Sequence, residues 1–319
     1  MMGSCAAKRR LHGELMGFSN RQSGVFLVLA AAMLWGTSGT AQRFAPGGYD
    51  PLIIGALRLL VGGTALLCLA AWRRELGHFR DWNWRQVLAA ALCISSYQLC
   101  FFAGVHLTGV AVGTMVAIGS TPVVGGLFGH FFFGERLRPR WWLATLLAVT
   151  GCTLLGLGSA ALHVNIWGIL LALGAGLAYA IYTFFLKALL ASHSPTAVVA
   201  VGSGGGALLL LPVLWRCDPV WLLQWRSVAV ALYLGLVTLA FAYWLLARGL
   251  RGLPASMVVT LGLAEPVTAT LLGLVVLGER LHSLSAAGIV LVFAGLLVLA
   301  APLPRRGAGQ GRIGGREEA

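Results

Sequence analysis

A segment that occurs twice constrains the fold of this chain more than any other feature. Residues 121–137 (TPVVGGLFGHFFFGERL) align without a gap with residues 265–281 (EPVTATLLGLVVLGERL), at a distance of 144 residues. Both copies have proline at the second position and end in Gly-Glu-Arg-Leu. The register extends into the flanking sequence, where it aligns Gly24 with Gly168, Pro51 with Pro195, Gly62 with Gly206, and Gly151 with Gly295. A gapless register over half of a chain indicates an internal duplication.

Each half of the chain contains five apolar runs that are long enough to cross a bilayer. About 20 helical residues span a hydrocarbon core of roughly 30 Å. The sequence is 58% hydrophobic and only 10% charged, which is more apolar than a soluble domain needs. The runs lie at 24–42, 51–72, 86–106, 109–133, 141–161, 166–187, 195–215, 227–247, 254–277 and 284–302. We therefore predict an all-α integral membrane protein with ten transmembrane helices, in repeats at 24–161 and 166–303.

The distribution of positive charge predicts the orientation of these helices. Eighteen of the 23 Lys and Arg residues fall in the tails and loops on the side of the N-terminus, and four fall on the opposite side. Because an excess of Lys and Arg marks the cytoplasmic side, both termini are predicted to be cytoplasmic. We expect cytoplasmic tails at 1–23 and 304–319, the second of them disordered. Charges spread over loops in this way do not indicate a nucleic-acid partner, despite the net charge of +13.

An odd number of spans in each half has a direct consequence for the fold. The second half must cross the membrane upside down relative to the first, so the ten helices form two inverted five-helix repeats. Inverted repeats are common in secondary transporters, which bind substrate near the midplane between the repeats. Exchange of roles between the halves would produce inward-open and outward-open states. The repeat therefore predicts alternating access.

Glu265 is the leading candidate for a functional residue. It is the only acidic residue well inside a predicted span, and its counterpart in the first repeat is Thr121. A charge at mid-membrane is costly and should face a polar interior. Desolvation would favour the neutral acid and allow proton exchange, whereas a nearby Arg58 would hold it ionised. Glu265 is thus predicted to couple transport to protons, to bind a cationic or amino substrate, or to complete a structural pair with Arg58.

Other residues within the spans carry weaker signals. Arg58 either extends to the outer surface or pairs with an inward-facing carboxylate. Pro122 and Pro266 are predicted to bend two helices around one central cavity. Several polar or amphipathic side chains could bind substrate or could hydrogen-bond neighbouring helices. These are Trp35, Tyr97, Gln98, Tyr179, Tyr182 and Tyr243, of which Trp35 and Tyr179 are counterparts in the repeat.

The ends of the fourth and ninth spans carry adjacent opposite charges. Glu135 precedes Arg136, and Glu279 precedes Arg280. We interpret these as interfacial anchors with a charge pair at the end of each helix. The six cysteines show no metal-ligand spacing, and the glycine clusters lack the Lys-Ser/Thr of a phosphate loop. The sequence thus predicts no metal site, no cofactor and no built-in ATPase.

The chain resembles the ten-span EamA-type members of the drug/metabolite transporter superfamily over residues 24–302. The resemblance depends on the five-span repeat, the paired Pro-x11-Gly-Glu-Arg segments, Trp35-Gly36 and Ala56-Leu57-Arg58. It implies a carrier of the inner membrane that exports amino acids, metabolites or toxic compounds, often in exchange for protons. It does not name a substrate.

The predicted function is therefore secondary active transport. We expect a non-enzymatic exporter of a small metabolite, amino acid or drug-like compound, with the lipid bilayer and a small molecule as its partners and protons as a candidate coupling ion. The alternative is an integral-membrane enzyme or lipid-handling protein that uses the same cavity. Such enzymes usually carry clustered His, Asp or Glu at a membrane face, and the sequence has no such cluster.

Overall fold

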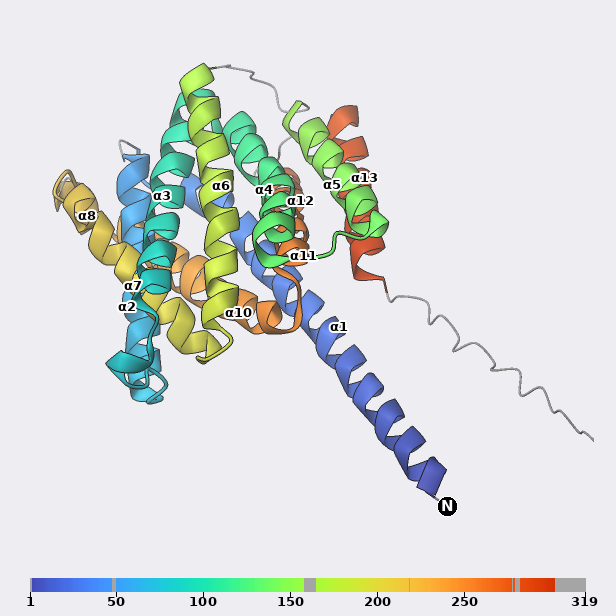
Figure 1. Cartoon of the computed structure of the whole chain (residues 1–319). Coiled ribbons are helices and arrows are strands. Elements are labelled where there is room, and N and C mark those ends of the chain that lie inside the picture. The colour runs from blue at the N-terminus through green and yellow to red at the C-terminus, as the bar shows by residue number, and fades with distance from the viewer. Residues whose placement is uncertain are drawn as a thin grey trace, which may run out of the picture.

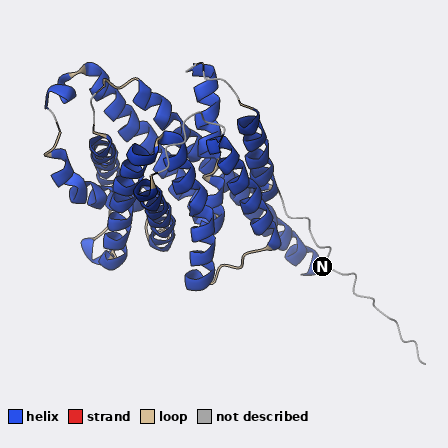
Figure 2. Cartoon of the chain, turned by 90° about the horizontal axis from the view of Figure 1, so that it is seen from above, coloured by secondary structure: helices blue, strands red, loops and turns tan. Residues whose placement is uncertain are grey.

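The computed structural model describes residues 2–47, 50–157, 165–217, 219–276, 278 and 282–301, with the side chains of 2–21, 110–111 and 219 excepted. Within these ranges every regular element is a helix, and no strand occurs (Figure 2). Ten helices in the same ranges are long and apolar enough to cross a membrane. The predicted all-α membrane fold with ten spans is confirmed.

Eight of the ten spans are single helices, and the eighth and ninth spans are each divided into shorter helical elements. The first five spans are α1 (Met2–Arg43), α2 (Pro51–Trp72), α3 (Trp84–Thr108), α4 (Val110–Phe133) and α5 (Pro139–Leu157), with the short η1 (Phe79–Asp81) before α3. The second half begins with α6 (Ile166–Leu189), α7 (Pro195–Leu214) and the short α8 (Pro219–Leu223). The eighth span consists of α9 (Trp225–Leu232), η2 (Tyr233–Phe241) and α10 (Ala242–Gly252). The ninth consists of α11 (Ala255–Leu261) and α12 (Ala264–Val276), and the tenth is α13 (Ser283–Ala300).

Several helices begin where the sequence supplies a side-chain cap. The carboxylate of Asp50 accepts the Leu52 N–H at the start of α2, and the Ser194 hydroxyl accepts the Ala197 N–H at the start of α7. A proline follows each of these caps, at a position where its missing N–H is harmless. The repeat-related helices α2 and α7 therefore begin in the same way.

The first helix is longer than the sequence analysis predicts. Its membrane-crossing part is Gln22–Arg43, but the helix continues back to Met2 and extends out of the bundle (Figure 1). Residues 2–21 contain no proline, so nothing in this polar segment interrupts the helix. The predicted tail at 304–319 lies outside the described residues.

Contacts between the helices follow a pseudo-two-fold relation. α3 packs on α6, and α1 packs on α10; replacing each residue by its counterpart 144 residues away converts one pair into the other. The pairs α2–α7 and α5–α13 each map onto themselves (Figure 1). The two halves therefore pack as the predicted inverted repeats.

The α5–α13 pair shows this symmetry at the level of single residues. A Cβ added to Gly151 would lie 2.7 Å from the carbonyl oxygen of Gly288, and one added to Gly295 would lie 2.7 Å from that of Ala144. The 144-residue shift converts each of these contacts into the other. Small residues let the two backbones approach closely, as is typical of packing between membrane helices.

The π-helical element η2 changes the repeat register by one residue. Each π turn takes in about one residue more than an α turn, and π segments often lie at functional sites. Up to Leu239, which lies within η2, contacts of the eighth span match those of α3 at a shift of 144 residues, but after η2 they match at 145. The contacts compared are Gly62 with Leu239 and Gly206 with Ser95 at the first shift, and Gly249 with Gly24 and Gly104 with Gly168 at the second. The structure thus contains a local insertion that the gapless alignment does not show.

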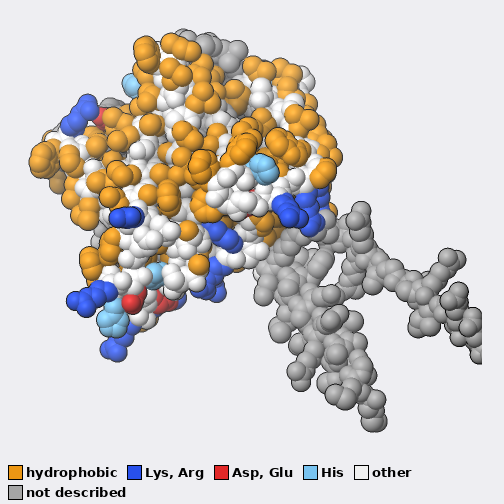
Figure 3. Space-filling model, in the orientation of Figure 1, with side chains coloured by type: hydrophobic (Ala, Val, Ile, Leu, Met, Phe, Trp, Pro, Cys, Tyr) orange, Lys and Arg blue, Asp and Glu red, His pale blue; other side chains and the backbone are white. Residues whose placement is uncertain are grey.

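The surface is divided between a broad apolar area and a charged end. Figure 3 shows hydrophobic side chains over most of the visible face, with Lys and Arg gathered toward one end. The apolar area includes strongly exposed Phe131, Phe132, Trp167 and Leu297, as expected for contact with lipid. The charge distribution supports the predicted orientation, which stays a prediction.

Candidate functional site

Five of the predicted site residues form one aromatic cluster at the centre of the bundle. The Trp35 ring on α1 lies 5.8 Å from Tyr179 on α6 and 5.1 Å from Tyr243 on α10, measured between ring centroids. The Tyr97 ring on α3 lies 5.3 Å from Tyr179, and Tyr182 lies 6.0 Å from Tyr243. The cluster therefore joins helices of both repeats.

The cluster lies on the axis that relates the two halves. Trp35 and Tyr179 occupy equivalent positions in the repeat, and their rings contact each other nearly perpendicularly. Two equivalent residues can touch only where the pseudo-two-fold axis passes between them. For inverted repeats, this axis lies in the plane of the membrane, where transporters bind substrate.

Polar groups around the cluster have hydrogen-bonding capacity that the described part of the chain does not use. The buried atoms Trp35 Nε1, Ser38 Oγ, Arg58 Nε and Gln98 Oε1 have no hydrogen-bond partner among the described residues. Such orphaned atoms are uncommon in protein interiors, since desolvation without a partner is unfavourable. These atoms can therefore serve a polar ligand.

Arg58 is held by the backbone of the opposite half. Its side chain is only 6% exposed, and Nη2 donates a hydrogen bond to the Thr238 carbonyl at 3.0 Å. Thr238 belongs to η2, so the inserted π segment supplies this anchor. Arg58 neither extends to the surface nor lies within ion-pair distance of a described carboxylate.

Gln98 is anchored in a similar way on α3. It is 2% exposed, and its Nε2 donates to the Gly55 carbonyl at 3.1 Å. One polar atom is thus fixed by α2, while the amide oxygen keeps its acceptor capacity. The side chain is positioned rather than free to rotate.

The ninth span is broken immediately before Glu265. Its helical hydrogen bonds give way to i→i−3 bonds, from the Leu263 N–H to Thr260 at 3.1 Å and from the Glu265 N–H to Gly262 at 3.0 Å. The sequence analysis expects Pro266 to bend the ninth helix, and a proline at this position has no N–H to donate to the Gly262 carbonyl. Instead, the Glu265 N–H satisfies that carbonyl, and Pro266 lies in the first turn of α12, where it fits without loss.

This break places Glu265 in the first turn of α12. The positive end of a helix dipole stabilises a carboxylate there. Glu265 is partly buried, and its carboxylate forms no ion pair with a described residue. The group is therefore surrounded by protein without a fixed partner.

Glu265 and Arg58 lie beside the same aromatic cluster without pairing. The backbone of Glu265 packs against Gly36, the residue after Trp35, and Arg58 is bonded to η2, which ends two residues before Tyr243. The two side chains form no ion pair with each other. An acid and a base thus lie near one set of aromatic rings.

At the charged end of the bundle, Glu135 joins the two halves. Its carboxylate accepts the N–H groups of Ala255 at 2.9 Å and of Ser256 at 3.2 Å. The interpretation of Glu135 as the partner of Arg136 is corrected, because the side chain caps α11 of the other repeat. The local sequence around Glu135 does not indicate that its carboxylate accepts hydrogen bonds from N–H groups in the other repeat. Its counterparts Glu279 and Arg280 lie outside the described residues.

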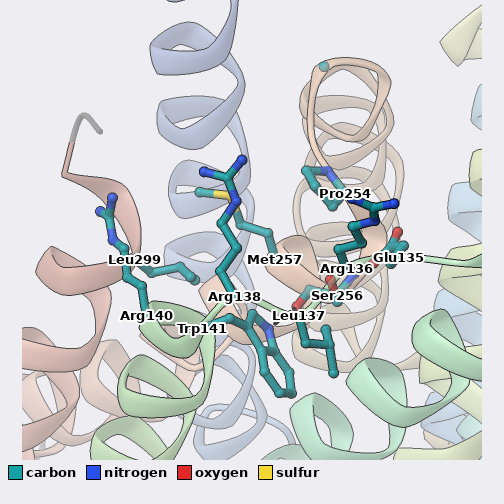
Figure 4. A pocket seen from close by; sticks show the side chains of 11 residues that line it. Glu135, Arg136, Leu137, Arg138, Arg140, Trp141, Pro254, Ser256, Met257 and Leu299 are labelled. Atoms are coloured by element: carbon teal, nitrogen blue, oxygen red, sulfur yellow. Dashed lines mark hydrogen bonds between the residues drawn. The ribbon is translucent and has the colours of Figure 1, made fainter. Parts of the chain in front are cut away.

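Two basic residues cap further helix ends at the same side. Lys187 Nζ donates to the carbonyls of Leu250 at 2.5 Å and Leu253 at 2.8 Å, and Arg140 donates to those of Val298 and Ala301. Cations at the carboxyl ends of helices satisfy both the open carbonyls and the helix dipole. Next to these contacts lies a pocket of about 410 Å³ (Figure 4). Among the described residues, no group of three or more His, Cys, Asp or Glu could hold a metal ion.

Comparison with known proteins identifies the family of this arrangement. The profile of the EamA-like transporter family matches residues 22–157 and again residues 166–301. The chain belongs to the EamA-like transporter family. The predicted resemblance is thereby confirmed, and each matched segment contains five of the ten spans.

Two relatives are also transporters. An uncharacterized transporter of Bacillus subtilis, YwfM, is 47% identical over 280 residues, which cover 88% of this chain and 94% of the relative. The threonine/homoserine exporter RhtA of Escherichia coli K12 is 30% identical over 267 residues, 81% of this chain and 84% of the relative. A solved crystal structure, 22% identical, has a TM-score of 0.74 over 87% of this chain and 96% of its own, which shows a shared fold.

Proposed function

We propose that this transporter is a secondary active exporter of small zwitterionic metabolites of the amino-acid class. The observation that carries the proposal is the pair of opposite charges, Glu265 and Arg58, which lie beside one aromatic cluster without pairing with each other. Export proceeds by alternating access between the inverted repeats.

The chemistry of a zwitterion matches this arrangement at both ends. A substrate ammonium group suits the Glu265 carboxylate and the faces of the neighbouring tyrosines. A substrate carboxylate suits the guanidinium of Arg58, whose buried Nε has no partner in the described part of the chain. Gln98 and Trp35 supply one further acceptor and one further donor. The threonine/homoserine exporter RhtA supports the same class of substrate.

Glu265 also suits a role in proton coupling. It is partly accessible, has no fixed described partner and lies directly after the break in the ninth span. Movement at this break would change both its access to water and its distance from Arg58. Protonation from outside and release inside would then drive substrate outward, since the carboxylate binds the proton and the substrate ammonium in turn.

The test uses purified protein in liposomes with radiolabelled threonine and homoserine, each compared with its methyl ester. Wild type is expected to exchange the free amino acids and to concentrate them under an imposed pH gradient. Glu265→Gln should abolish the response to the gradient, while the exposed-site control Asp81→Asn retains it. Arg58→Gln should weaken exchange of the free amino acid more than that of the ester, by about a hundredfold if a buried charged hydrogen bond is lost.

Two outcomes would overturn the proposal. Transport by Glu265→Gln with unchanged pH dependence would remove the coupling role. Equal losses for acid and ester in a folded Arg58→Gln protein would remove the assignment of Arg58 to the substrate carboxylate. The melting temperature of each variant in detergent separates these results from loss of folded protein.

A further inference from the structure

We propose that the pocket between α5, α11 and α13 binds the phosphate headgroup of an anionic phospholipid. The pocket holds about 410 Å³ and is separate from the aromatic cluster, none of whose residues lines it. Its walls come from both repeats: the loop before α5 belongs to the first, and the start of α11 and the end of α13 belong to the second (Figure 4).

The charge of the pocket is strongly positive. Arg136, Arg138 and Arg140 line it together with a single acid, Glu135. The Glu135 carboxylate already accepts two backbone N–H groups at the start of α11, and Arg140 is bonded to carbonyls at the end of α13. Arg136 and Arg138 are exposed, and neither forms an ion pair with a described residue. Two guanidinium groups are therefore available to an anion.

The rest of the lining is apolar, which distinguishes a lipid from a free anion. Leu137, Trp141, Met257 and Leu299 contribute apolar side chains. Figure 4 shows the guanidinium groups of Arg138 and Arg140 on one side, with the rings of Trp141 and the side chain of Leu137 on the other. A ligand with a phosphate and an adjoining hydrocarbon part satisfies both sides, whereas inorganic phosphate would leave the apolar side without a contact.

The position of the pocket is also that of a lipid headgroup. It lies where α5 begins and α13 ends, at the level of the membrane–water interface. Nearby side chains are exposed as in contact with lipid, including Trp142 at 50% and Phe132 at 73%. In the predicted orientation this interface is the cytoplasmic leaflet, where anionic lipids and basic pockets between helices meet. A bound headgroup would connect the two repeats beside the Glu135 cap and would favour the conformation in which they touch.

The experiment measures binding and thermal stability of the full-length protein with dioleoyl phosphatidylglycerol, dioleoyl phosphatidylcholine or inorganic phosphate. Native mass spectrometry should show about a tenfold preference for phosphatidylglycerol, and this lipid should raise the melting temperature. Arg136→Gln with Arg138→Gln should remove both effects. Arg136→Lys with Arg138→Lys should retain most of them, because the charge remains.

The matched control removes two exposed arginines from the same end of the molecule, Arg80→Gln with Arg85→Gln. It should respond to phosphatidylglycerol as wild type does. An equal loss in this control would indicate a general effect of surface charge and overturn the proposal. Equal stabilisation by inorganic phosphate would indicate a free-anion site and overturn the lipid assignment. Failure of phosphatidylglycerol to bind wild type would overturn it entirely.

Discussion

The fourth and ninth spans occupy equivalent places in the two repeats, yet they solve the problem of an internal proline differently. α4 continues as one helix through Pro122, although the proline has no N–H to donate to the Ile118 carbonyl. Beside it, the hydroxyls of Ser120 and Thr121 both donate to the Ala117 carbonyl, at 3.1 and 2.8 Å. The ninth span instead ends one helix at Leu261 and starts another at Ala264. The duplication has kept the proline but not the helix around it.

The difference shows where the two halves have separate tasks. In α4 the counterpart of Glu265 is Thr121, which is 4% exposed and bonded to its own helix. In the ninth span the same place carries an acid at the start of a helix, next to the aromatic cluster. The symmetric parts of the fold hold the halves together, and the asymmetric part carries the candidate chemistry.

The largest loss of stability should follow from placing a glutamate in the first repeat, at the counterpart of Glu265. Thr121→Glu would bury a longer, charged side chain in a closely packed helix and should destabilise the protein by about 3–5 kcal/mol. The measurement is the yield and melting temperature of protein that elutes as a single species, with Thr121→Ser as the control. A folded, stable Thr121→Glu protein would show that residue 121 borders a water-accessible space. The fourth and ninth spans would then not differ in the way described.

The reverse exchange should spare the fold and remove the activity. Glu265→Thr gives the ninth span the residue that the fourth already carries, in a place that is only partly buried. Yield should remain near that of wild type, while transport falls by about a hundredfold through loss of one charged contact. Flux in liposomes, normalised to protein, is the readout. Wild-type flux would mean that the asymmetry between the halves has no functional role.

A smaller effect tests the packing beside the break. A Cβ added to Gly36 would lie 2.6 Å from Thr268 Cβ and 2.7 Å from the Glu265 carbonyl oxygen. Its counterpart in α6, Ala180, already carries a Cβ and is fully buried. Gly36→Ala should therefore cost about 1–3 kcal/mol by overpacking and displace the first turn of α12.

The control for this packing test is Ala180→Gly, which should cost about 1 kcal/mol through helix propensity. Thermal unfolding in detergent and transport are measured for both variants. If Gly36→Ala changes neither the melting temperature nor the transport rate, α1 and α12 are not in close contact at Gly36 in the functioning protein.

The smallest effect concerns the break itself. Gly262 has φ −56°, a conformation open to alanine, and an added Cβ would lie 3.1 Å from the Val259 carbonyl oxygen. Gly262→Ala favours continuous helix by about 1 kcal/mol, which would change the ratio of conformations, and hence the transport rate, by about fivefold. Gly273→Ala within α12 is the control for helix propensity away from the break. An equal change in both variants would argue against a hinge at Gly262.

The sequence predicts the architecture well because its signals are local or periodic. Hydropathy locates ten spans, and Pro122 and Pro266 fix the repeat register. It also identifies the aromatic residues, since Trp and Tyr are conspicuous within apolar runs. What it cannot supply is the partner of a group whose acceptor lies far along the chain. Arg58 donates to a carbonyl 180 residues away, and Glu135 accepts from N–H groups 120 and 121 residues away.

Local breaks in the helices are equally hard to predict. Pro266 points to an interruption, but the structure places it at Gly262 and Leu263, where tertiary contacts decide between α-type and i→i−3 hydrogen bonds. The gapless alignment gives no sign of the π segment at Tyr233–Phe241, because it continues across this segment at the same shift of 144 residues. Backbone geometry of this kind depends on packing rather than on residue type.

The contact between α5 and α13 has a consequence for how such a chain can arise. Both helices contribute the same small-residue surface, and the Gly151–Gly288 and Ala144–Gly295 contacts are copies of one another. A single five-helix ancestor that inserted in both orientations would therefore have met its own inverted copy through a self-complementary face. Fusion of two such copies would fix one copy of each orientation in every molecule. From that point, residue 265 could become an acid while residue 121 remained a threonine, because one mutation no longer altered both halves.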